Sequence, residues 1–185
     1  GCITISRAKS QVTFPADFLL VAAMNPCPCG YLGDTRKTCR CSLGAIHKYQ
    51  SKISGPVLDR IDIHIEVPPL SFQTLISQEP AESSAAIRER VCACRKVQRA
   101  RYRQRPYKTN SRMSPKDIKE FATPDLQGRK LIEIAMKELH LSARAYYKVL
   151  KISRTISDLA GSEQIQSEHI AEAIQYRSLD RQWYG

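Results

Sequence analysis

The sequence contains no apolar run approaching the ~20 residues that a membrane-spanning helix needs, and we find no signal peptide. We therefore expect a cytoplasmic protein with no membrane partner. The chain is also short of acidic residues: 18 aspartates and glutamates stand against 29 lysines and arginines, which leaves a net charge of +11. A basic balance of this size favours an anionic partner such as a nucleotide or a nucleic acid.

The excess of positive charge is concentrated in one segment. From Arg88 to Arg112, ten lysines and arginines stand against Glu89 alone, a net charge of +9. Tyr102 and Tyr107 are the only aromatic residues there, so stacking on nucleic-acid bases has little support. Two interpretations remain open: a solvated arginine-rich helix, and a contact surface for DNA phosphates.

The first residues of the chain read as β-structure. Ile3–Arg7 and Gln11–Phe14 alternate around a short tip, which predicts a β-hairpin with Arg7 and Lys9 at or near its turn. The continuous apolar run Phe18–Ala23 then favours a central strand that is covered on both faces.

Two polar residues stand beside predicted strands. Asn25 comes after Phe18–Ala23, at the strand end where open α/β sheets bind ligands, although a turn asparagine is the alternative interpretation. Arg60 precedes Ile61–Val67, whose alternation of apolar and polar residues predicts a second strand. A fixed guanidinium can stabilise charge on a transferring phosphoryl group, and the alternative is a solvated arginine.

Four of the seven cysteines form two Cys-x-Cys pairs in the loop-like residues 27–44: Cys27 with Cys29, and Cys39 with Cys41. Clustered thiols in a cytoplasmic protein favour metal binding over disulfides. Four thiolates suffice for a tetrahedral zinc site, which would order a loop that has few apolar residues. Free thiols in a flexible loop and a redox pair are the alternatives.

The rest of the chain is predicted to be helical. A short helix spans Ala45–Ile53, residues 70–82 read as a linker, and a long helix begins with Ser84 as its N-cap and ends at Pro106. Its apolar stripe consists of Ile87, Val91, Cys94 and Val97. Cys92 and Cys94 point in different directions around this helix and cannot share an ion.

Capping signals place the later helices. Ser114-Pro115 and Thr123-Pro124 each put a capping residue before a first-turn proline, and Ser142 caps a helix that Gly161 closes. A last helix spans Ser167 to Arg177. The core face of the Ser142 helix is predicted to contain Ala145, Val149, Ile152, Ile156 and Leu159. Strands followed by helices indicate two subdomains with a boundary near residues 106–113.

Longer stretches carry a family resemblance. ITISRAKSQVTFPADFLLVAAMNP, SGPVLDRIDIHIEV, LSARAYYKVLKISRTISDLAG and HIAEAIQYR follow one another in the chain. In this order they resemble the magnesium-chelatase-like AAA+ ATPases, and within them the ComM/YifB subgroup. The resemblance covers nearly the whole chain.

The resemblance implies roles for particular residues. Asn25 is similar to the sensor-1 residue that orients the attacking water, and Arg60 to the arginine finger that reaches the neighbouring subunit's nucleotide. Arg144 resembles sensor 2 at the start of a lid helix. The hairpin resembles the pre-sensor-1 hairpin, which makes Arg7 and Lys9 candidate DNA contacts. A solvated hairpin tip is the alternative for these two residues.

One departure from the family pattern limits the chemistry. The sequence has no G-x-x-x-x-G-K-[ST] loop and no apolar run ending in Asp-Glu. We therefore expect the C-terminal part of an AAA+ subunit, with residues 1–108 from its core and 109–185 as the lid domain. The resemblance implies that ATP and Mg²⁺ bind only to the intact subunit and that this subunit forms a homo-hexamer. Residues 1–185 alone should not hydrolyse ATP.

The fold class expected is α/β: a partial AAA+ core, with a hairpin, parallel strands and a cysteine-rich insertion, followed by an all-helical lid. The resemblance implies a DNA-remodelling motor, such as a helicase or a branch-migration enzyme. A chelatase-type subunit that drives metal insertion is one alternative. Another is a non-catalytic, zinc-stapled nucleic-acid-binding module, and a thiol redox protein is a third.

Overall fold

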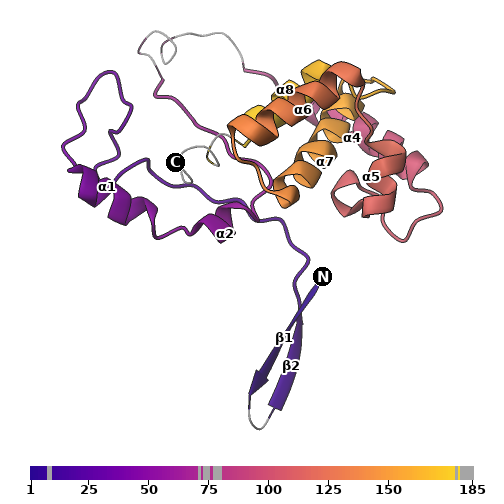
Figure 1. Ribbon diagram of the computed structural model, residues 1–185, viewed down its shortest axis with the longest axis horizontal. Helices are drawn as coiled ribbons and strands as arrows, with labels where there is room; N and C mark the ends of the chain where they lie inside the picture. Colours follow the sequence, from indigo (N-terminus) through magenta and orange to yellow (C-terminus); the bar gives the residue numbers. More distant parts are fainter. Residues whose placement is uncertain (8–9, 71, 73–75, 77–80, 178, 180–185) are drawn as a thin grey trace. The chain divides into compact units, whose positions relative to one another are not determined.

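The computed structural model describes the whole chain except residues 8–9, 71, 73–75, 77–80, 178 and 180–185. The chain divides into two compact units, Gly1–Ser51 and Lys52–Gly185, and each is described by itself (Figure 1). This division is one of contacts, and the functional boundary at 108/109 stays a prediction. No helix in the described ranges combines the length and the apolar character that crossing a membrane requires.

The first unit begins with the predicted hairpin, which is confirmed. Strands β1 (Cys2–Arg7) and β2 (Ser10–Pro15) pair antiparallel, with Cys2 opposite Pro15 and Arg7 opposite Ser10. The hydroxyl oxygens of Thr4 and Thr13 lie 3.0 Å apart across the pair. Arg7 therefore ends β1 beside the turn, whereas Lys9 lies outside the described residues.

The prediction of a central strand at Phe18–Ala23 is wrong. Residues 16–25 have no regular secondary structure, and Leu19 and Val21 are 89% and 83% exposed. A strand is stabilised by hydrogen bonds to a neighbouring strand, and β1 and β2 form the only sheet in the described part of the chain. An apolar sequence without a ladder partner stays irregular.

The first unit ends in helix α1 (Leu43–Gln50), which starts two residues before the predicted Ala45. Ser42 is its N-cap, and the Ser42 hydroxyl accepts a hydrogen bond from the Ala45 amide at 3.3 Å. The Gln50 side chain donates to the Pro26 carbonyl oxygen at 3.2 Å, so the end of α1 contacts the start of the cysteine loop.

In the second unit the short helix α2 (Gly55–Leu58) comes first. The strand predicted at Ile61–Val67 is a second correction, because these residues are irregular and Ile65 and Val67 are 68% and 85% exposed. Ile61, Asp62 and His64 contact residues of α7 (Ala143–Leu159) and of the end of α8 (Ser167–Gln175) instead of a neighbouring strand.

Where the structure describes residues 81–177, five α-helices follow, together with a short 3₁₀ helix η1 (Asn110–Arg112). They are α4 (Ser84–Arg101), α5 (Pro115–Phe121), α6 (Leu126–Glu138), α7 (Ala143–Leu159) and α8 (Ser167–Gln175). The capping box at Ser114, the Ser142 cap and a left-handed Gly161 with φ of 69° are confirmed. Helix α6 is capped by Asp125 rather than by Thr123, because Pro124 is engaged in a bridge with Ile165.

These helices enclose the main hydrophobic core, and α7 contributes to it along much of its length. Ile170 and Ala173 of α8 are fully buried in it. The stripe predicted for α4 is largely wrong: Cys94 is buried, but Ile87, Val91 and Val97 are exposed by 42–45%. The buried apolar cluster consists of Tyr102, Met113, Ile118, Ala122, Ile132, Val149, Leu150, Ile165, Ile170 and Ala173.

A polar network is buried beside this core. The carboxylate of Asp158 accepts hydrogen bonds from Arg101 Nη1 at 2.6 Å and from Arg154 Nε at 3.1 Å. Asn110 Nδ2 donates to the same carboxylate at 2.8 Å. One buried negative charge thus faces two guanidinium groups, and this network joins α4, η1 and α7.

Candidate functional site

Arg60 follows Asp59, the C-cap of α2, and is exposed. Its Nη1 donates to the carbonyl oxygen of Pro56 at 2.7 Å, one helical turn earlier. Within the described ranges its guanidinium forms no ion pair, and its charge is therefore available to an external anion.

The backbone that carries Arg60 is held by helix α7. Lys148 Nζ donates to the Arg60 carbonyl oxygen at 2.5 Å and lies 2.8 Å from a carboxylate oxygen of Asp62. The Lys148 side chain is only 14% exposed. The Lys148 ammonium group therefore contacts both the residue before and the residue after Ile61, while the Arg60 side chain stays exposed.

The end of α8 holds the same segment from another direction. Arg177 is fully buried and donates through Nη1 to the Ile61 carbonyl oxygen. The His64 amide donates to the Tyr176 carbonyl oxygen at 2.8 Å. These contacts replace the ladder that the predicted strand would have had, and they attach residues 60–64 to the helical part of the second unit.

Arg144, in the first turn of α7, forms an ion pair with Asp59. Its Nη1 lies 2.7 Å from Asp59 Oδ2, and the Ser142 hydroxyl donates to Oδ1 at 2.8 Å. Partial burial acts to raise the pKa of Asp59, but the hydrogen bonds from Arg144 and Ser142 outweigh it and lower that pKa. Arg60 and Arg144 are thus brought into one part of the second unit, because the ion-pair partner of Arg144 is the residue that precedes Arg60.

Asn25 belongs to the first unit and is exposed. A Cβ placed on Gly30 would lie 3.6 Å from Asn25 Nδ2, so the amide rests against the turn that contains the first cysteine pair. Gly30 has a φ of 80°, which favours glycine, and its amide donates to the Cys27 carbonyl oxygen at 3.0 Å. That Asn25 acts together with Arg60 and Arg144 stays a prediction.

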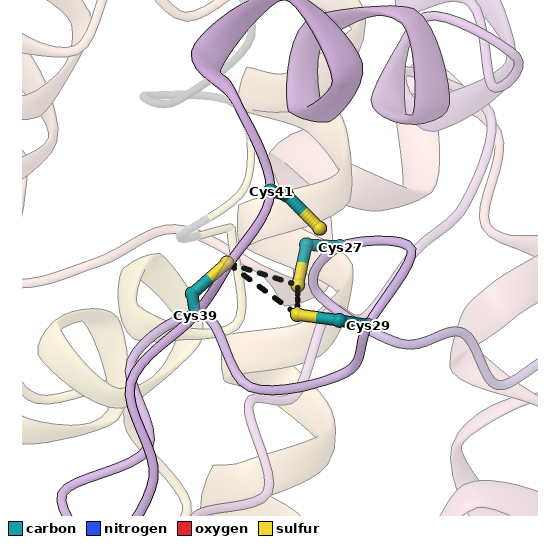
Figure 2. Close-up of side chains that lie close together, drawn as sticks. All are labelled: Cys27, Cys29, Cys39 and Cys41. Atoms are coloured by element: carbon teal, nitrogen blue, oxygen red, sulfur yellow. Dashed lines mark hydrogen bonds between the residues drawn. The ribbon is translucent and has the colours of Figure 1, made fainter.

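The four predicted metal ligands come together in the first unit. Figure 2 shows the side chains of Cys27, Cys29, Cys39 and Cys41 pointing toward a common centre, and their sulfur atoms all lie within 4.8 Å of one another. The Cys27–Cys29, Cys29–Cys39 and Cys27–Cys39 sulfur distances are 3.4, 3.5 and 3.6 Å. All four residues are free cysteines.

The pKa values of two neighbouring thiols in this cluster, Cys29 and Cys39, are shifted in opposite directions. Backbone hydrogen bonds at Tyr31 and then at Arg40 lower the pKa of the Cys29 thiol to about 6. At Cys39 a backbone hydrogen bond at Cys41 acts to lower the pKa, but burial and the sulfurs of Cys29 and Cys27 raise it to about 12. The Cys29 thiol is therefore more acidic than the Cys39 thiol, and a bound cation would favour the thiolate form of both.

The basic segment 88–112 is only partly a free surface. Arg90 pairs with Glu82 at 2.6 Å, and Arg105 pairs with Asp117 at 3.0 Å. Lys108 Nζ donates to three backbone carbonyl oxygens, at 2.8–3.1 Å. Together with Arg101 in the buried network, these residues use their charge within the protein. Exposed cations remain on α4 and just after it, namely Arg88, Arg95, Lys96, Arg99 and Arg103.

Comparison with known protein families gives matches in both units of the chain. The family model for the magnesium chelatase subunit ChlI matches residues 1–75, and the model for the C-terminal part of that subunit matches residues 81–177. The chain belongs to the magnesium chelatase ChlI family. Residues 81–177 contain helices α4 to α8, so the family assignment includes the helical part that holds Arg144.

The chain is also similar in sequence to individual bacterial proteins, one of which is a competence protein. It is 42% identical over 182 residues to the competence protein ComM of Haemophilus influenzae and 37% identical over 183 residues to YifB of Salmonella typhimurium. A protein of Mycobacterium bovis is 29% identical over 177 residues. These alignments cover 96–98% of this chain but 35% of each relative, so the chain spans about a third of their length.

Several residues of the site were not predicted from the sequence. Asp59, the ion-pair partner of Arg144, is one of them, and its only local sign in the sequence is that it adjoins Arg60. Lys148 and Arg177 lie 88 and 116 residues from the carbonyl groups that they bind, and nothing in their own neighbourhoods indicates these contacts.

Proposed function

We propose that this chain is the sensor, arginine-finger and lid portion of a magnesium-chelatase-like AAA+ ATPase, and that the intact subunit remodels DNA. One observation carries the proposal: Arg60 is exposed, while Lys148 of α7 binds its carbonyl oxygen and Arg177, just after α8, binds that of Ile61. A guanidinium presented in this way suits a group that stabilises the transferring phosphoryl group of a neighbouring subunit. ATP and Mg²⁺ are the proposed ligands of the intact subunit, and a homo-hexamer is its proposed assembly.

The roles proposed for the three residues differ in which subunit they serve. Arg60 acts on the nucleotide of the neighbouring subunit, whereas Asn25 orients water and Arg144 senses phosphate in their own subunit. Removal of an arginine finger lowers turnover by about 10³-fold or more. If Arg60 acts on the neighbouring subunit's nucleotide, two inactive variants can restore activity when they are mixed. Two residues that act in the same subunit could not do so.

A mixing experiment with the whole subunit tests these roles. Asn25→Ala and Arg60→Ala should each abolish ATP hydrolysis, and a mixture of the two should regain activity well above either alone. Regain is expected because an interface between an Arg60→Ala site and an Asn25→Ala neighbour contains both intact residues. Lys130→Ala, an exposed cation on α6, is the control and should leave hydrolysis unchanged. If the mixture stays inactive while both variants assemble, Arg60 does not act between subunits.

The proposed DNA contact is the hairpin tip. Arg7 ends β1, and Lys9 is the neighbouring cation in the sequence. Replacing both with alanine should weaken DNA binding by the whole subunit and lower the slope of log affinity against log salt by about 2. An unchanged slope would remove the hairpin from the DNA interface without affecting the proposed ATPase roles.

A second candidate function has its own supporting observation, the cluster of four cysteine sulfurs. It is a non-catalytic, zinc-stapled basic module that binds nucleic acid without nucleotide. The two functions differ in their response to ATP. DNA binding by the whole subunit that is indifferent to ATP and to Arg60→Ala would favour the module, whereas ATP-dependent binding favours the motor.

A further inference from the structure

The first unit has very little hydrophobic core. Among the described residues of Gly1–Ser51, only Cys27 and Ile46 are buried. The loop between the two cysteine pairs is ordered by small contacts: Asp34 pairs with Arg36 at 3.3 Å, and Lys37 Nζ lies 4.1 Å from the Tyr31 ring centre. Exposed pairs of this kind contribute little stability, so a unit of this size needs another source of order.

The arrangement of sulfur atoms supplies the geometry of a metal site. In a tetrahedral zinc–thiolate centre, a zinc–sulfur bond of about 2.3 Å places neighbouring sulfurs about 3.8 Å apart. The three short sulfur–sulfur distances, 3.4–3.6 Å, lie close to this value. A disulfide requires about 2.05 Å, and none of the cysteines forms one.

The type of ligand matches a structural centre. All four candidate ligands are cysteines, and a shell of four thiolates is one of the usual ligand sets of structural zinc. Four protein ligands also fill a tetrahedral shell completely, which is typical of structural rather than catalytic zinc.

We propose that Cys27, Cys29, Cys39 and Cys41 bind one zinc ion, which orders the first unit by tying the start of the cysteine loop to the N-terminus of α1. Both ends of α1 lie close to the cysteine loop. Cys41 directly precedes the N-cap Ser42, and Gln50 at the other end of α1 binds the Pro26 carbonyl oxygen. This inference stands independently of nucleotide hydrolysis, because it concerns the folding of the first unit alone.

Metal analysis tests the ligand set. The chain purified without chelator should contain one zinc per molecule, and Cys39→Ser should lose it. Cys92→Ser is the matched control, because this exposed cysteine on α4 lies outside the cluster. Replacement of zinc by Co²⁺ in the unaltered chain should give the thiolate charge-transfer and intense visible bands of tetrahedral sulfur coordination. The Co²⁺ spectrum keeps the test valid even if Cys39→Ser does not fold.

Three results would overturn the assignment. The first is zinc well below one per chain together with no tetrahedral Co²⁺ spectrum. The second is iron with acid-labile sulfide, which would make the centre an iron–sulfur cluster. The third is an equal loss of zinc in Cys39→Ser and Cys92→Ser.

Hydrogen exchange tests the ordering role. Removal of the ion with a chelator should raise amide exchange in residues 42–50 of α1, while the buried core of α5–α8 keeps its protection. Unchanged exchange in α1 after complete zinc removal would overturn the ordering role, and the ion would then be bound without organising the unit.

Discussion

Arg144 Nη1 lies 2.7 Å from Asp59 Oδ2, so the first turn of helix α7 is linked to the residue before the proposed arginine finger. The same carboxylate accepts a hydrogen bond from Ser142, the N-cap of α7. An arginine that is to bind nucleotide phosphate must first leave this carboxylate. The ion pair therefore connects the proposed sensor 2 with the position of Arg60 in the same subunit.

Asp59→Asn tests whether this pair competes with nucleotide. The Arg144 side chain is 59% exposed, so the pair should contribute no more than about 1 kcal/mol to stability. In the whole subunit, Asp59→Asn should tighten ATP binding by about 2–5-fold, the equivalent of about 0.5–1 kcal/mol, because Arg144 no longer has to break an ion pair. Fluorescent-nucleotide titration measures the change.

The control for that experiment is Glu133→Gln, which removes another exposed pair, with Lys137 at 2.7 Å. It should cost a similar small amount of stability and leave nucleotide affinity unchanged. Weaker or unaltered ATP binding in Asp59→Asn would mean that the carboxylate only stabilises the fold.

Asp158→Asn should be far more destabilising than any surface change. Its carboxylate is fully buried and neutralises Arg101 and Arg154, which are themselves 14% and 4% exposed. Removing the one negative charge leaves two guanidinium groups without a counter-ion, and the expected loss is about 3–5 kcal/mol. Urea denaturation followed by circular dichroism measures it. Glu120→Gln, at an exposed pair with Arg105, is the control and should cost about 1 kcal/mol or less. A loss below that for Asp158→Asn would contradict the network.

Parts of this fold could be predicted from the sequence because their signals are local. Ser114, Ser142 and Gly161 mark helix ends through their own backbone and side-chain chemistry, and the hairpin alternates over a few residues. The two Cys-x-Cys pairs likewise predicted that four sulfur atoms lie together, and the structure shows them within 4.8 Å of one another.

Other parts depend on distant partners, and sequence periodicity does not contain them. Phe18–Ala23 has the composition of a buried strand, but no strand in the described part of the chain pairs with it. Helix α7 buries a polar face with Arg154, Ser157 and Asp158, whereas its apolar pattern indicates only one side. The contacts of Arg177 with residues 61–62 could not be predicted, since an arginine near a C-terminal helix is most often solvated.

Acid should destabilise the second unit through Asp117. Hydrogen bonds from the Ser114 and Tyr107 hydroxyls are the main causes that lower its pKa to about 2. An unfolded aspartate has a pKa of about 3.9, so the carboxylate stabilises the fold above pH ~4 and this contribution is lost as the pH falls toward ~2. Asp117→Asn should therefore flatten the fall in unfolding free energy over that range. Ser114→Ala should act in the same direction by less. A wild-type slope in Asp117→Asn would contradict the assignment.

Gly128→Ala should destabilise the chain although alanine is the better helix former. Gly128 stands in the first turn of α6, and a Cβ there would lie 2.9 Å from Asp125 Oδ1 and 3.2 Å from Ile170 Cγ1. The gain in helix propensity, about 1 kcal/mol, is opposed by overpacking of about 1–3 kcal/mol and by disturbance of the Asp125 cap, whose oxygen lies 2.6 Å from the Gly128 amide. Circular-dichroism melts should show a lower midpoint. Gly44→Ala in α1 is the comparison, because no atom lies within 4 Å of its Cβ position and the substitution should be neutral or stabilising. A Gly128→Ala chain that melts at or above the wild-type midpoint would show that α6 and α8 can separate without cost, and the close approach at Ile170 would then have no energetic role.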